Sequence, residues 1–345
     1  MKQALYKNYA DDIAHMLRTG SKGKNKSNMT LSKGLSGPVM DTSPTMNWLN
    51  ENKREANFRS LSALNSITGT EVRYAEKLGS HPSFSHLKNT NNSEYHYIVT
   101  MFVDIKNSTG LFKKYDPDVV ANICRVIQMA AIHTCWYFDG YIHRLQGDGL
   151  MVYFGGRNVT KQKAVDNSLM AASFISYFME NDLRDMFDEQ GVKRIYSRIG
   201  IDFGDDEDTL WHNAGIGECS EVTTTGLHTS LPCKMQGQAV SNGVVVGDNI
   251  INYKTSHADY FKHLTYKSDG EESDYIYQEP ENRFYYKQHE FNWRRYLKNH
   301  PSIEETEDGE LKFKDVILPA STNVLNNMSQ LQQNATGYKP YFTDK

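Results

Sequence analysis

The sequence is poor in cysteine and has no long apolar run. Its four cysteines, Cys124, Cys135, Cys219 and Cys233, form no Cys-x-x-Cys pair and no zinc-like spacing. This argues against a zinc module or a disulfide-stapled fold and is typical of reduced thiols. No apolar stretch approaches the roughly 20 residues that cross a bilayer, and the first residues lack the apolar core of a signal peptide. We therefore expect a cytoplasmic protein without a membrane partner.

An excess of positive charge is also missing. The 345 residues carry 38 Lys and Arg against 42 Asp and Glu, a net charge of −4, whereas nucleic-acid-binding domains are usually basic. The segment KQHEFNWRRYLKNHP (287–301) interleaves basic and aromatic residues, which could stack single-stranded nucleic acid. A C-terminal helix whose aromatics pack on the domain explains the same pattern. We favour packing and expect no nucleic-acid partner.

Composition divides the chain into four parts. The expected parts are a basic N-terminal arm (1–93), a domain of strands and helices (94–252), a Tyr-rich extension (253–318) and a disordered tail (319–345). Within the arm, residues 19–45 are rich in Gly, Ser, Lys, Asn and Pro, which predicts a flexible linker. Apolar residues at helical spacing between 46 and 67 predict one or two amphipathic helices.

The order of elements in the second part is that of a ferredoxin-like fold. The patterns predict a strand over 95–105, a helix over 116–138, a hairpin over 140–155, a helix over 161–180 and a strand over 194–204. Gly147-Asp148-Gly149 is a strong turn signal between the hairpin strands. A possible strand over 214–222, a short helix near 227–236 and a strand over 243–247 follow. We therefore expect an α+β, βαββαβ sandwich with N- and C-terminal extensions.

Two aspartates occupy positions that favour metal chemistry. Asp104 ends the first strand and Asp148 lies at the tip of the hairpin, and in a βαββαβ sheet these strands are neighbours. Two carboxylates at one edge repel each other unless a cation neutralises them, and hard oxygen ligands favour Mg²⁺ or Mn²⁺ over zinc. The polar turn 105–110 could add the Ile105 carbonyl as a ligand and bind a triphosphate through its amides. A capping role or a turn role would explain either aspartate alone, but the two together favour the metal site.

The strand and the hairpin together resemble the catalytic core of the class III nucleotidyl cyclases. FVDIKNSTGLF (102–112) and HRLQGDGLMVYFGG (143–156) match the family signature of an apolar strand ending in Asp-Ile and a Gly-Asp-Gly hairpin. The resemblance implies a class III cyclase sandwich with two divalent ions, Mn²⁺ or Mg²⁺, held by Asp104, Asp148 and the Ile105 carbonyl. One ion would activate the ribose 3′-hydroxyl for attack on the α-phosphorus, and the other would hold the β- and γ-phosphates.

The same resemblance implies the remaining site residues. TTTGLHTSLPCKMQG (223–237) matches the segment that places Thr223 at a base-reading position and Ser230 and Lys234 where the family has Asn and Arg. Lys234 keeps the positive charge but lacks the guanidinium fork. Arg144, four residues before the hairpin aspartate, takes the other base-reading position; a surface ion pair is its alternative role. The implied catalytic residues are Asp104, Asp148, Ser230 and Lys234, and the implied substrate-binding residues are Phe102, Lys106, Asn107, Ser108, Thr109, Arg144 and Thr223.

Arg144 with Thr223 differs from the purine-reading pairs of the family. A guanidinium only donates hydrogen bonds, so it suits a small base with carbonyl or ring-nitrogen acceptors, such as cytosine or uracil. The pattern resembles the pyrimidine cyclases of bacterial Pycsar anti-phage systems. It implies conversion of CTP or UTP to cyclic CMP or cyclic UMP plus pyrophosphate, a second messenger for a separate effector protein. CTP is slightly favoured, because Thr223 could accept a hydrogen bond from the cytosine amino group.

Other functions remain open on the sequence. A uridylate cyclase, a purine cyclase with a divergent pocket, or an inactive nucleotide-binding regulatory module would each fit, the last because Ser230 and Lys234 depart from the family. No Gly-Gly-Asp/Glu-Glu-Phe-like segment supports a diguanylate cyclase. The family's sites form between head-to-tail protomers, so the resemblance implies a homodimer with two shared sites.

Overall fold

The computed structural model describes residues 5–20, 57–58, 60–68, 77–253, 258–268, 271–274, 276–279, 281, 283–307 and 309–314. Nearly all of the linker expected at 19–45, the first half (46–56) of the helical region expected at 46–67 and the tail expected at 319–345 lie outside these residues. The chain divides into two units, 1–300 and 301–345. The second contains the hairpin of β14 (Ile303–Glu305) and β15 (Leu311–Phe313).

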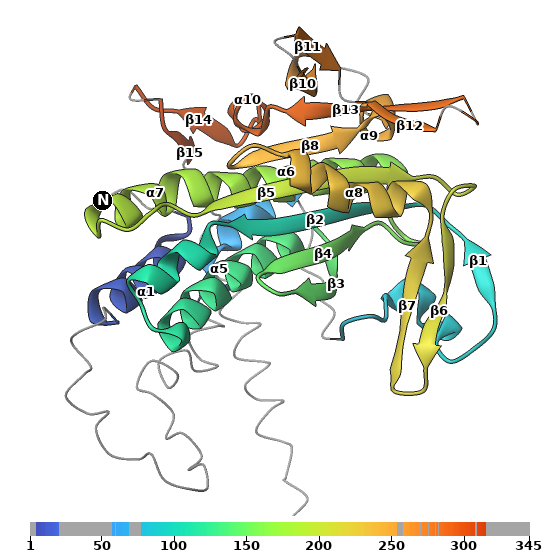
Figure 1. The fold of residues 1–345 in the computed structure, drawn as a ribbon, viewed down its shortest axis with the longest axis horizontal. Helices are drawn as coiled ribbons and strands as arrows, with labels where there is room; N and C mark the ends of the chain where they lie inside the picture. The colour runs from blue at the N-terminus through green and yellow to red at the C-terminus, as the bar shows by residue number, and fades with distance from the viewer. Residues whose placement is uncertain are drawn as a thin grey trace, which may run out of the picture. The chain divides into compact units, whose positions relative to one another are not determined.

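A central sheet carries the predicted βαββαβ order (Figure 1). In chain order it is built from β2 (Ile98–Lys106), α5 (Pro117–Tyr137), β3 (Gly140–Gln146), β4 (Gly149–Phe154), α6 (Lys161–Tyr177) and β5 (Tyr196–Gly204). The four strands lie in the order β5-β2-β4-β3, and each neighbouring pair is antiparallel. This is the ferredoxin-like arrangement, so the predicted α+β fold class is confirmed.

The sheet continues past β5 with one strand that precedes residue 252 in the sequence and three strands that follow it. β8 (Gly243–Gly247) pairs parallel to β5, and β13 (Phe284–Phe291) pairs antiparallel to β8. β12 (Ile276–Glu279) and β9 (Phe261–His263) both pair with β13. Strands of both expected parts, 94–252 and 253–318, therefore lie in one sheet. The boundary at residue 252 stays a prediction.

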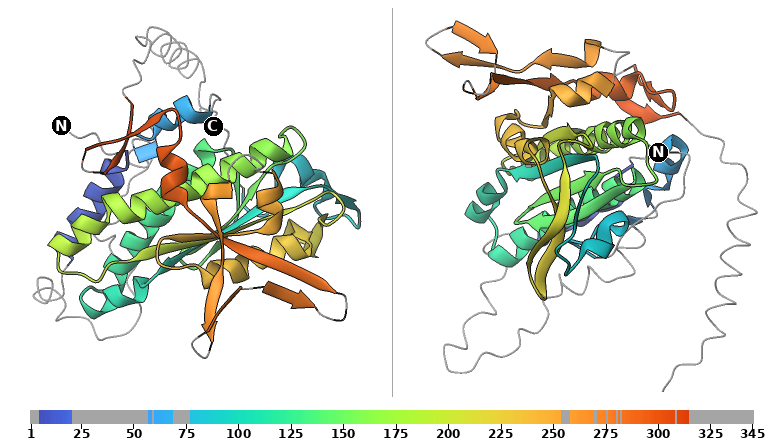
Figure 2. Two further views of the ribbon diagram at one scale, coloured as in Figure 1. Left: turned by 90° about the horizontal axis from the view of Figure 1, so that it is seen from above. Right: turned by 90° about the vertical axis from the view of Figure 1, so that its right-hand side faces the viewer.

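Helices α5 and α6 cover one face of this sheet (Figure 2). Val103 and Ile105 of β2 meet Ile127 of α5 and Ile175 of α6 there. Within the described part of the chain, α5 is the one helix long and apolar enough to span a membrane, and 61% of its apolar window is buried. Packing in the core explains its apolar character. On the outer side of α5 lies α1 (Lys7–Thr19), where the Tyr9 hydroxyl lies 2.8 Å from Nδ1 of His133.

The opposite face is covered by α8 (Leu227–Gln238) and flanked by the hairpin of β6 (Leu210–Ile216) and β7 (Cys219–Thr225). Helix α8 approaches β5 so closely that a Cβ on Gly200 would lie 2.1 Å from the Pro232 carbonyl oxygen, and only glycine fits there. The expected single strand at 214–222 is in fact a hairpin that turns at Gly217, whose φ is +55°. The β-branched Thr223–Thr225 extend β7 beyond the end expected for that strand.

The segment 287–301 is half strand and half helix, which corrects the expectation of one C-terminal helix. Its first residues, 287–291, belong to β13, and residues 288–290 pair with β8. Its second half forms α10 (Trp293–Lys298). Trp293 is 6% exposed, and its indole donates to the Asn242 carbonyl at 2.9 Å. The expected packing of these aromatics on the domain is confirmed.

Shorter elements complete the described chain. They are η1 (Ser62–Leu64), α4 (Asn65–Thr68), η2 (Pro82–Leu87), β1 (Ser93–Tyr95), η3 (Ser108–Lys113), η4 (Phe178–Asp182), α7 (Arg184–Glu189), α9 (Asp248–Tyr253), η5 (Ala258–Tyr260), β10 (Thr265–Ser268) and β11 (Glu271–Asp274).

Candidate active site

Asp104 and Asp148 lie at the same end of neighbouring strands. Asp104 is the third residue from the end of β2, and Asp148 is in the turn between β3 and β4. Strand β4 pairs with β2 up to this end, where Leu150 lies opposite Val103. A Cβ on Gly149 would lie 2.6 Å from the Val103 carbonyl oxygen and 3.7 Å from the Asp104 Cα. The missing side chain at Gly149 is therefore what lets the two backbones approach.

Each carboxylate is bound by a neighbour through its Oδ2 atom. Arg198, directly opposite Asp104 in β5, donates to it from Nη2 at 2.6 Å and from Nε at 3.2 Å. Ser108 donates to Asp148 from its hydroxyl at 2.6 Å. Both aspartates are thus compensated within the chain, one by a charge and one by a hydroxyl.

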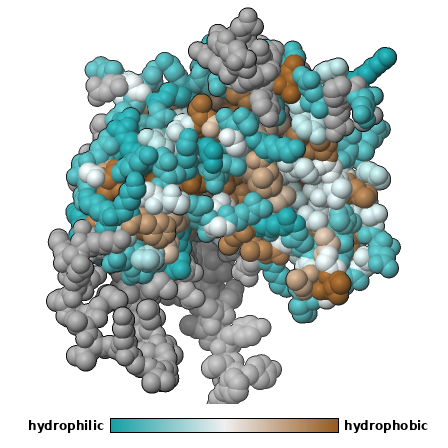
Figure 3. All heavy atoms as spheres, viewed as in Figure 1, coloured by the Kyte–Doolittle hydropathy of each residue, from teal (hydrophilic) through white to brown (hydrophobic). Residues whose placement is uncertain are grey.

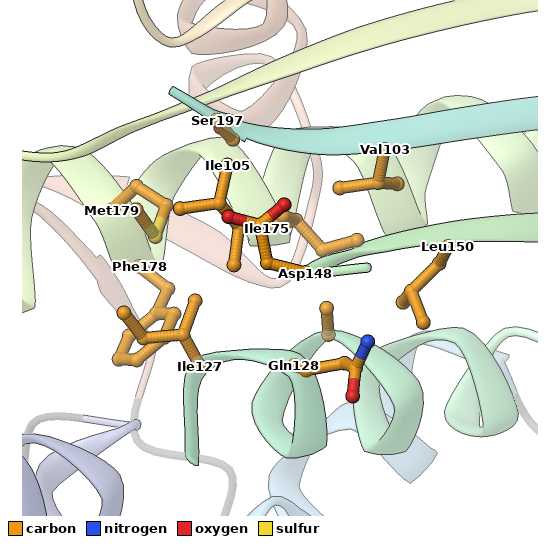
Figure 4. A pocket seen from close by; sticks show the side chains of 11 residues that line it. Val103, Ile105, Ile127, Gln128, Asp148, Leu150, Ile175, Phe178, Met179 and Ser197 are labelled. Carbon is orange, nitrogen blue, oxygen red and sulfur yellow. The ribbon is translucent and has the colours of Figure 1, made fainter. Parts of the chain in front are cut away.

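The Asp148 carboxylate projects into a cavity on one face of the strands (Figure 4). Asp148 lines a cavity of about 10 Å³ between the sheet and the helices, together with Val103, Ile105, Ile127 and Ile175. This cavity is too small for more than one water molecule. Asp104 lies between Val103 and Ile105 in the strand, so its side chain points to the opposite face. For both carboxylates to share a cation, Asp148 has to turn out of the cavity.

The donor chemistry at this strand end fits a hard divalent cation. Two carboxylates and the main-chain carbonyl of Ile105 are all oxygen donors, as Mg²⁺ and Mn²⁺ prefer. In the described ranges, no group of three or more His, Cys, Asp or Glu side chains is placed to hold a metal. A metal at this end would therefore depend on the aspartate pair and on main-chain or substrate oxygens.

Arg144 and Thr223 are brought together although they are 79 residues apart. Arg144 Nη2 lies 3.4 Å from the Thr223 hydroxyl oxygen. Thr223 is 8% exposed, and its hydroxyl also lies 3.1 Å from Nε2 of His143. Burial, and then the charge of Arg144, lowers the pKa of His143 to about 3, so this imidazole is neutral at pH 7.

Sequence reasoning missed Glu221, the carboxylate beside this pair. Arg144 donates from Nε to Glu221 Oε2 at 2.7 Å, and Nη2 contacts the other carboxylate oxygen. The surface ion pair considered as an alternative role for Arg144 therefore exists, next to Thr223. Glu221 precedes Thr223 by two residues and so shares its face of β7. That spacing would have identified Glu221 if residues 219–225 had been recognised as one strand.

Ser230 and Lys234 lie four residues apart on the exposed side of α8. Ser230 donates to the Gly226 carbonyl at 3.1 Å, and Lys234 Nζ lies 5.2 Å from the centre of the Tyr277 ring. Phe102 pairs with Gly200, which faces α8, and with Met151, which pairs with Arg144. Directly opposite residues share a face, so Asp104, Phe102, Arg144 and α8 are all on one face.

The predicted phosphate-binding turn continues from β2 into the short helix η3. Phe102 is 8% exposed within a core cluster that includes Tyr153 and Trp211. Asn107 has a left-handed φ of +72°, and its amide donates to the Arg194 carbonyl at 3.5 Å. Lys106 ends β2, Ser108 binds Asp148, and Thr109 is exposed.

Comparison with known proteins gives sequence relatives of one kind. No family model matches the chain. It is 36% identical over 250 residues to a curated "Cytidylate cyclase" of Staphylococcus aureus, covering 72% of this chain and 59% of that protein. A "Cytidylate cyclase" of Escherichia coli is 34% identical over 250 residues, covering 70% and 53%. The chain thus spans somewhat more than half the length of these relatives.

Among solved structures, the adenylyl cyclase CyaB from P. aeruginosa superposes with a TM-score of 0.47 at 15% identity, over 58% of this chain and 95% of that chain. The sequence matches to cytidylate cyclases run through both aspartate motifs and the βαββαβ domain that the structure shows. Over about 70% of its length the chain is related in sequence to these curated cytidylate cyclases.

Proposed function

We propose that the chain is a pyrimidine nucleotide cyclase that converts CTP to 3′,5′-cyclic CMP and pyrophosphate, with UTP as the alternative substrate. The observation that carries the proposal is the contact between Arg144 and Thr223, on the sheet face that also bears Asp104. Arg144 supplies donors for the carbonyl and ring-nitrogen acceptors of a pyrimidine. The names of the sequence relatives support the same reaction.

In this reaction the ribose O3′ forms a bond to the α-phosphorus, and the bond from that phosphorus to the bridging oxygen of pyrophosphate breaks. Two divalent ions, Mg²⁺ or Mn²⁺, held by Asp104, Asp148 and the Ile105 carbonyl would supply the Lewis acidity that lowers the pKa of the 3′-hydroxyl. Lys234 provides a positive charge for the phosphates, and Ser230 provides a hydroxyl beside it. The turn from Lys106 to Thr109 presents main-chain amides to the triphosphate.

We also propose a head-to-tail homodimer in which Asp104 and Asp148 of one protomer face Arg144, Thr223, Ser230 and Lys234 of the other. An exposed apolar side chain supports an interface on this side of the chain. Ile216, at the tip of the β6–β7 hairpin, is 88% exposed, and hydrophobic surface is visible at this end of the molecule (Figure 3). The cyclic product would act in the cytoplasm as an anti-phage second messenger for a separate effector protein.

The decisive experiment incubates the purified protein with each of the four NTPs and Mn²⁺ and measures cyclic nucleotide and pyrophosphate. We expect cyclic CMP from CTP, and a loss of at least about 100-fold in Asp148→Asn, because Asp148 supplies a metal ligand. Asp118→Asn is the matched control, since Asp118 is an exposed residue in the first turn of α5. Absence of product from every NTP, or full activity in Asp148→Asn, would refute the proposal.

A nucleotide-binding module without turnover is the second candidate. The contacts that favour it are those of Arg198 with Asp104 and of Ser108 with Asp148, which compensate both carboxylates within the chain. Calorimetry separates the two functions. Tight CTP binding in the presence of Mn²⁺ without release of pyrophosphate would favour the module.

A further inference from the structure

Glu221 forms one unit with Arg144. Its carboxylate accepts from Nε at 2.7 Å and contacts Nη2, and both side chains are half-buried between β3 and β7. This geometry uses one edge of the guanidinium. Among the described residues, the structure gives the Nη1 amino group no protein acceptor. A carboxylate has about four lone-pair directions, so Glu221 retains acceptor capacity beyond its two contacts with Arg144.

Glu221, Arg144 and Thr223 together form a polar surface, called the wall below, on which acceptor and donor groups lie side by side. Glu221 accepts, Arg144 donates, and Thr223, on the same face of β7, can do either. Behind them, the Tyr153 hydroxyl lies 3.4 Å from the Thr223 hydroxyl and 2.9 Å from that of Thr224. Tyr153 is fully buried, so the wall rests on a packed core.

The pairing edge of cytosine is complementary to this wall. Its 4-amino group donates, whereas N3 and O2 accept. Uracil presents O4 as an acceptor in place of the amino group and N3–H as a donor in place of the bare nitrogen. Uracil O4 would therefore face the carboxylate of Glu221, and two acceptors in contact repel each other. Adenine has an amino group but lacks an O2 for Arg144.

Resting on the proposed function, we propose that Glu221 determines the preference for CTP over UTP by accepting a hydrogen bond from the cytosine 4-amino group while Arg144 donates to N3 and O2. Glu221 thus has two tasks, to orient the guanidinium and to read the position-4 substituent. A polar protein group left unpaired against the wrong base discriminates strongly, because its lost hydrogen bonds are not replaced by water.

The first test measures kcat/KM for CTP and for UTP in the wild type and in Glu221→Gln. Glutamine keeps the shape, but its amide can donate to uracil O4. We expect the CTP-to-UTP ratio of kcat/KM to fall by about 10-fold or more. Glu207→Gln, the same change at an exposed residue between β5 and β6, should keep the wild-type ratio. A merely structural role for Glu221 would lower both values together and leave the ratio unchanged, which would overturn the assignment.

The second test changes the substrate instead of the protein, so its main result does not depend on a variant that folds. The wild type is given the triphosphate of 2-pyrimidinone riboside, which carries hydrogen in place of the 4-amino group. We expect its kcat/KM to be about 10-fold below that of CTP, and the difference to shrink in Glu221→Gln if that variant folds. Equal use of CTP and the analogue by the wild type would overturn the role of Glu221 while leaving the cyclase function intact. No product from any NTP would overturn both.

Discussion

At the scale of single residues, the site depends on a side chain that is missing. Gly149 follows Asp148 and lies against the Val103 carbonyl and the Gln146 carbonyl, where a Cβ would stand 2.6 Å and 3.2 Å from the two oxygens. Both oxygens belong to the backbone of the sheet, so they cannot move aside as the end of a flexible side chain can. The position of Asp148 is therefore set by the glycine after it.

Gly149→Ala should lower the free energy of unfolding by about 1–3 kcal/mol, as overpacking of a core does, and should lower cyclase activity because the turn shifts with β4. Urea unfolding and the CTP assay measure the two effects. Gly237→Ala is the control, since a Cβ there meets no atom within 4 Å and an alanine in α8 should stabilise the helix by about 0.5–1 kcal/mol. Equal unfolding free energies for the two variants would show that the β2–β4 approach is not tight.

Some residues of the candidate site could be predicted from local sequence patterns, and others could not. Asp104 and Asp148 each sit in a local pattern, a strand end and a Gly-Asp-Gly turn, so their adjacency follows from the order of elements. Arg144 and Thr223 were predicted only through a family resemblance. Glu221 was missed because its role comes from the contact of its side chain in β7 with Arg144 in β3, two strands of different sheets that are 77 residues apart in the chain.

At the scale of elements, a buried network ties α8 to two strands. Asp202 of β5 is fully buried, and its Oδ2 lies 3.0 Å from Nδ1 of His228 in α8. Its Oδ1 accepts from the Tyr286 hydroxyl of β13 at 2.7 Å and from the Phe203 amide at 2.9 Å. Tyr286 of the C-terminal extension thus binds Asp202, and Asp202 in turn binds His228 of α8, the helix that carries Ser230 and Lys234.

This network should make the fold less stable as the pH rises. Burial alone would lower the pKa of His228, but Asp202 outweighs it and raises that pKa above 6.5. Burial also raises the pKa of Asp202. Both shifts make the folded state bind more protons than the unfolded state, so the contribution is full below pH 6.5 and is lost as the pH rises through the pKa of folded His228.

Urea unfolding at steps from pH 6 to pH 9, compared between the wild type and His228→Gln, measures this contribution. The difference in unfolding free energy between the two proteins should shrink as the pH rises, because the variant has no imidazolium to lose. Parallel curves would mean that folding leaves the pKa of His228 unchanged.

Elements with a clear apolar pattern were predicted well. Helix α5 follows from apolar residues at helical spacing, and strand β2 follows from a continuous apolar run that is buried on both faces. The β6–β7 hairpin and strand β13 were not predicted as such. Their residues are polar or mixed, and their strand conformation is stabilised by pairing with β6 and β8 rather than by local preference.

At the scale of the whole molecule, the proposed dimer shares its sites between protomers. Asp148→Asn and Arg144→Ala would each be inactive alone, because every site in either homodimer is damaged. In a mixture, half the dimers would be mixed, and each of these would contain one intact site and one doubly damaged site. About a quarter of the wild-type activity should return after the two proteins are mixed and allowed to exchange subunits.

The control is a mixture of Asp148→Asn with Asp104→Asn, which places both defects on the same half of the site and should restore nothing. Recovery in neither mixture would indicate that each site is built within one chain. That arrangement would also agree with the shared face of Asp104 and Arg144.

The pairing of β13 with β8 has a consequence during synthesis. Gly247 pairs with Gln288, so the outer edge of β8 stays open until about 40 further residues have been translated. At roughly 5–20 residues per second, this lasts for several seconds. During that interval Val244, Val245 and Val246 present an apolar strand with unpaired backbone groups, which is a template for pairing with other nascent chains. Strand β13 of the C-terminal extension therefore covers an edge that would otherwise favour aggregation, and it does so only some seconds after β8 has been synthesised.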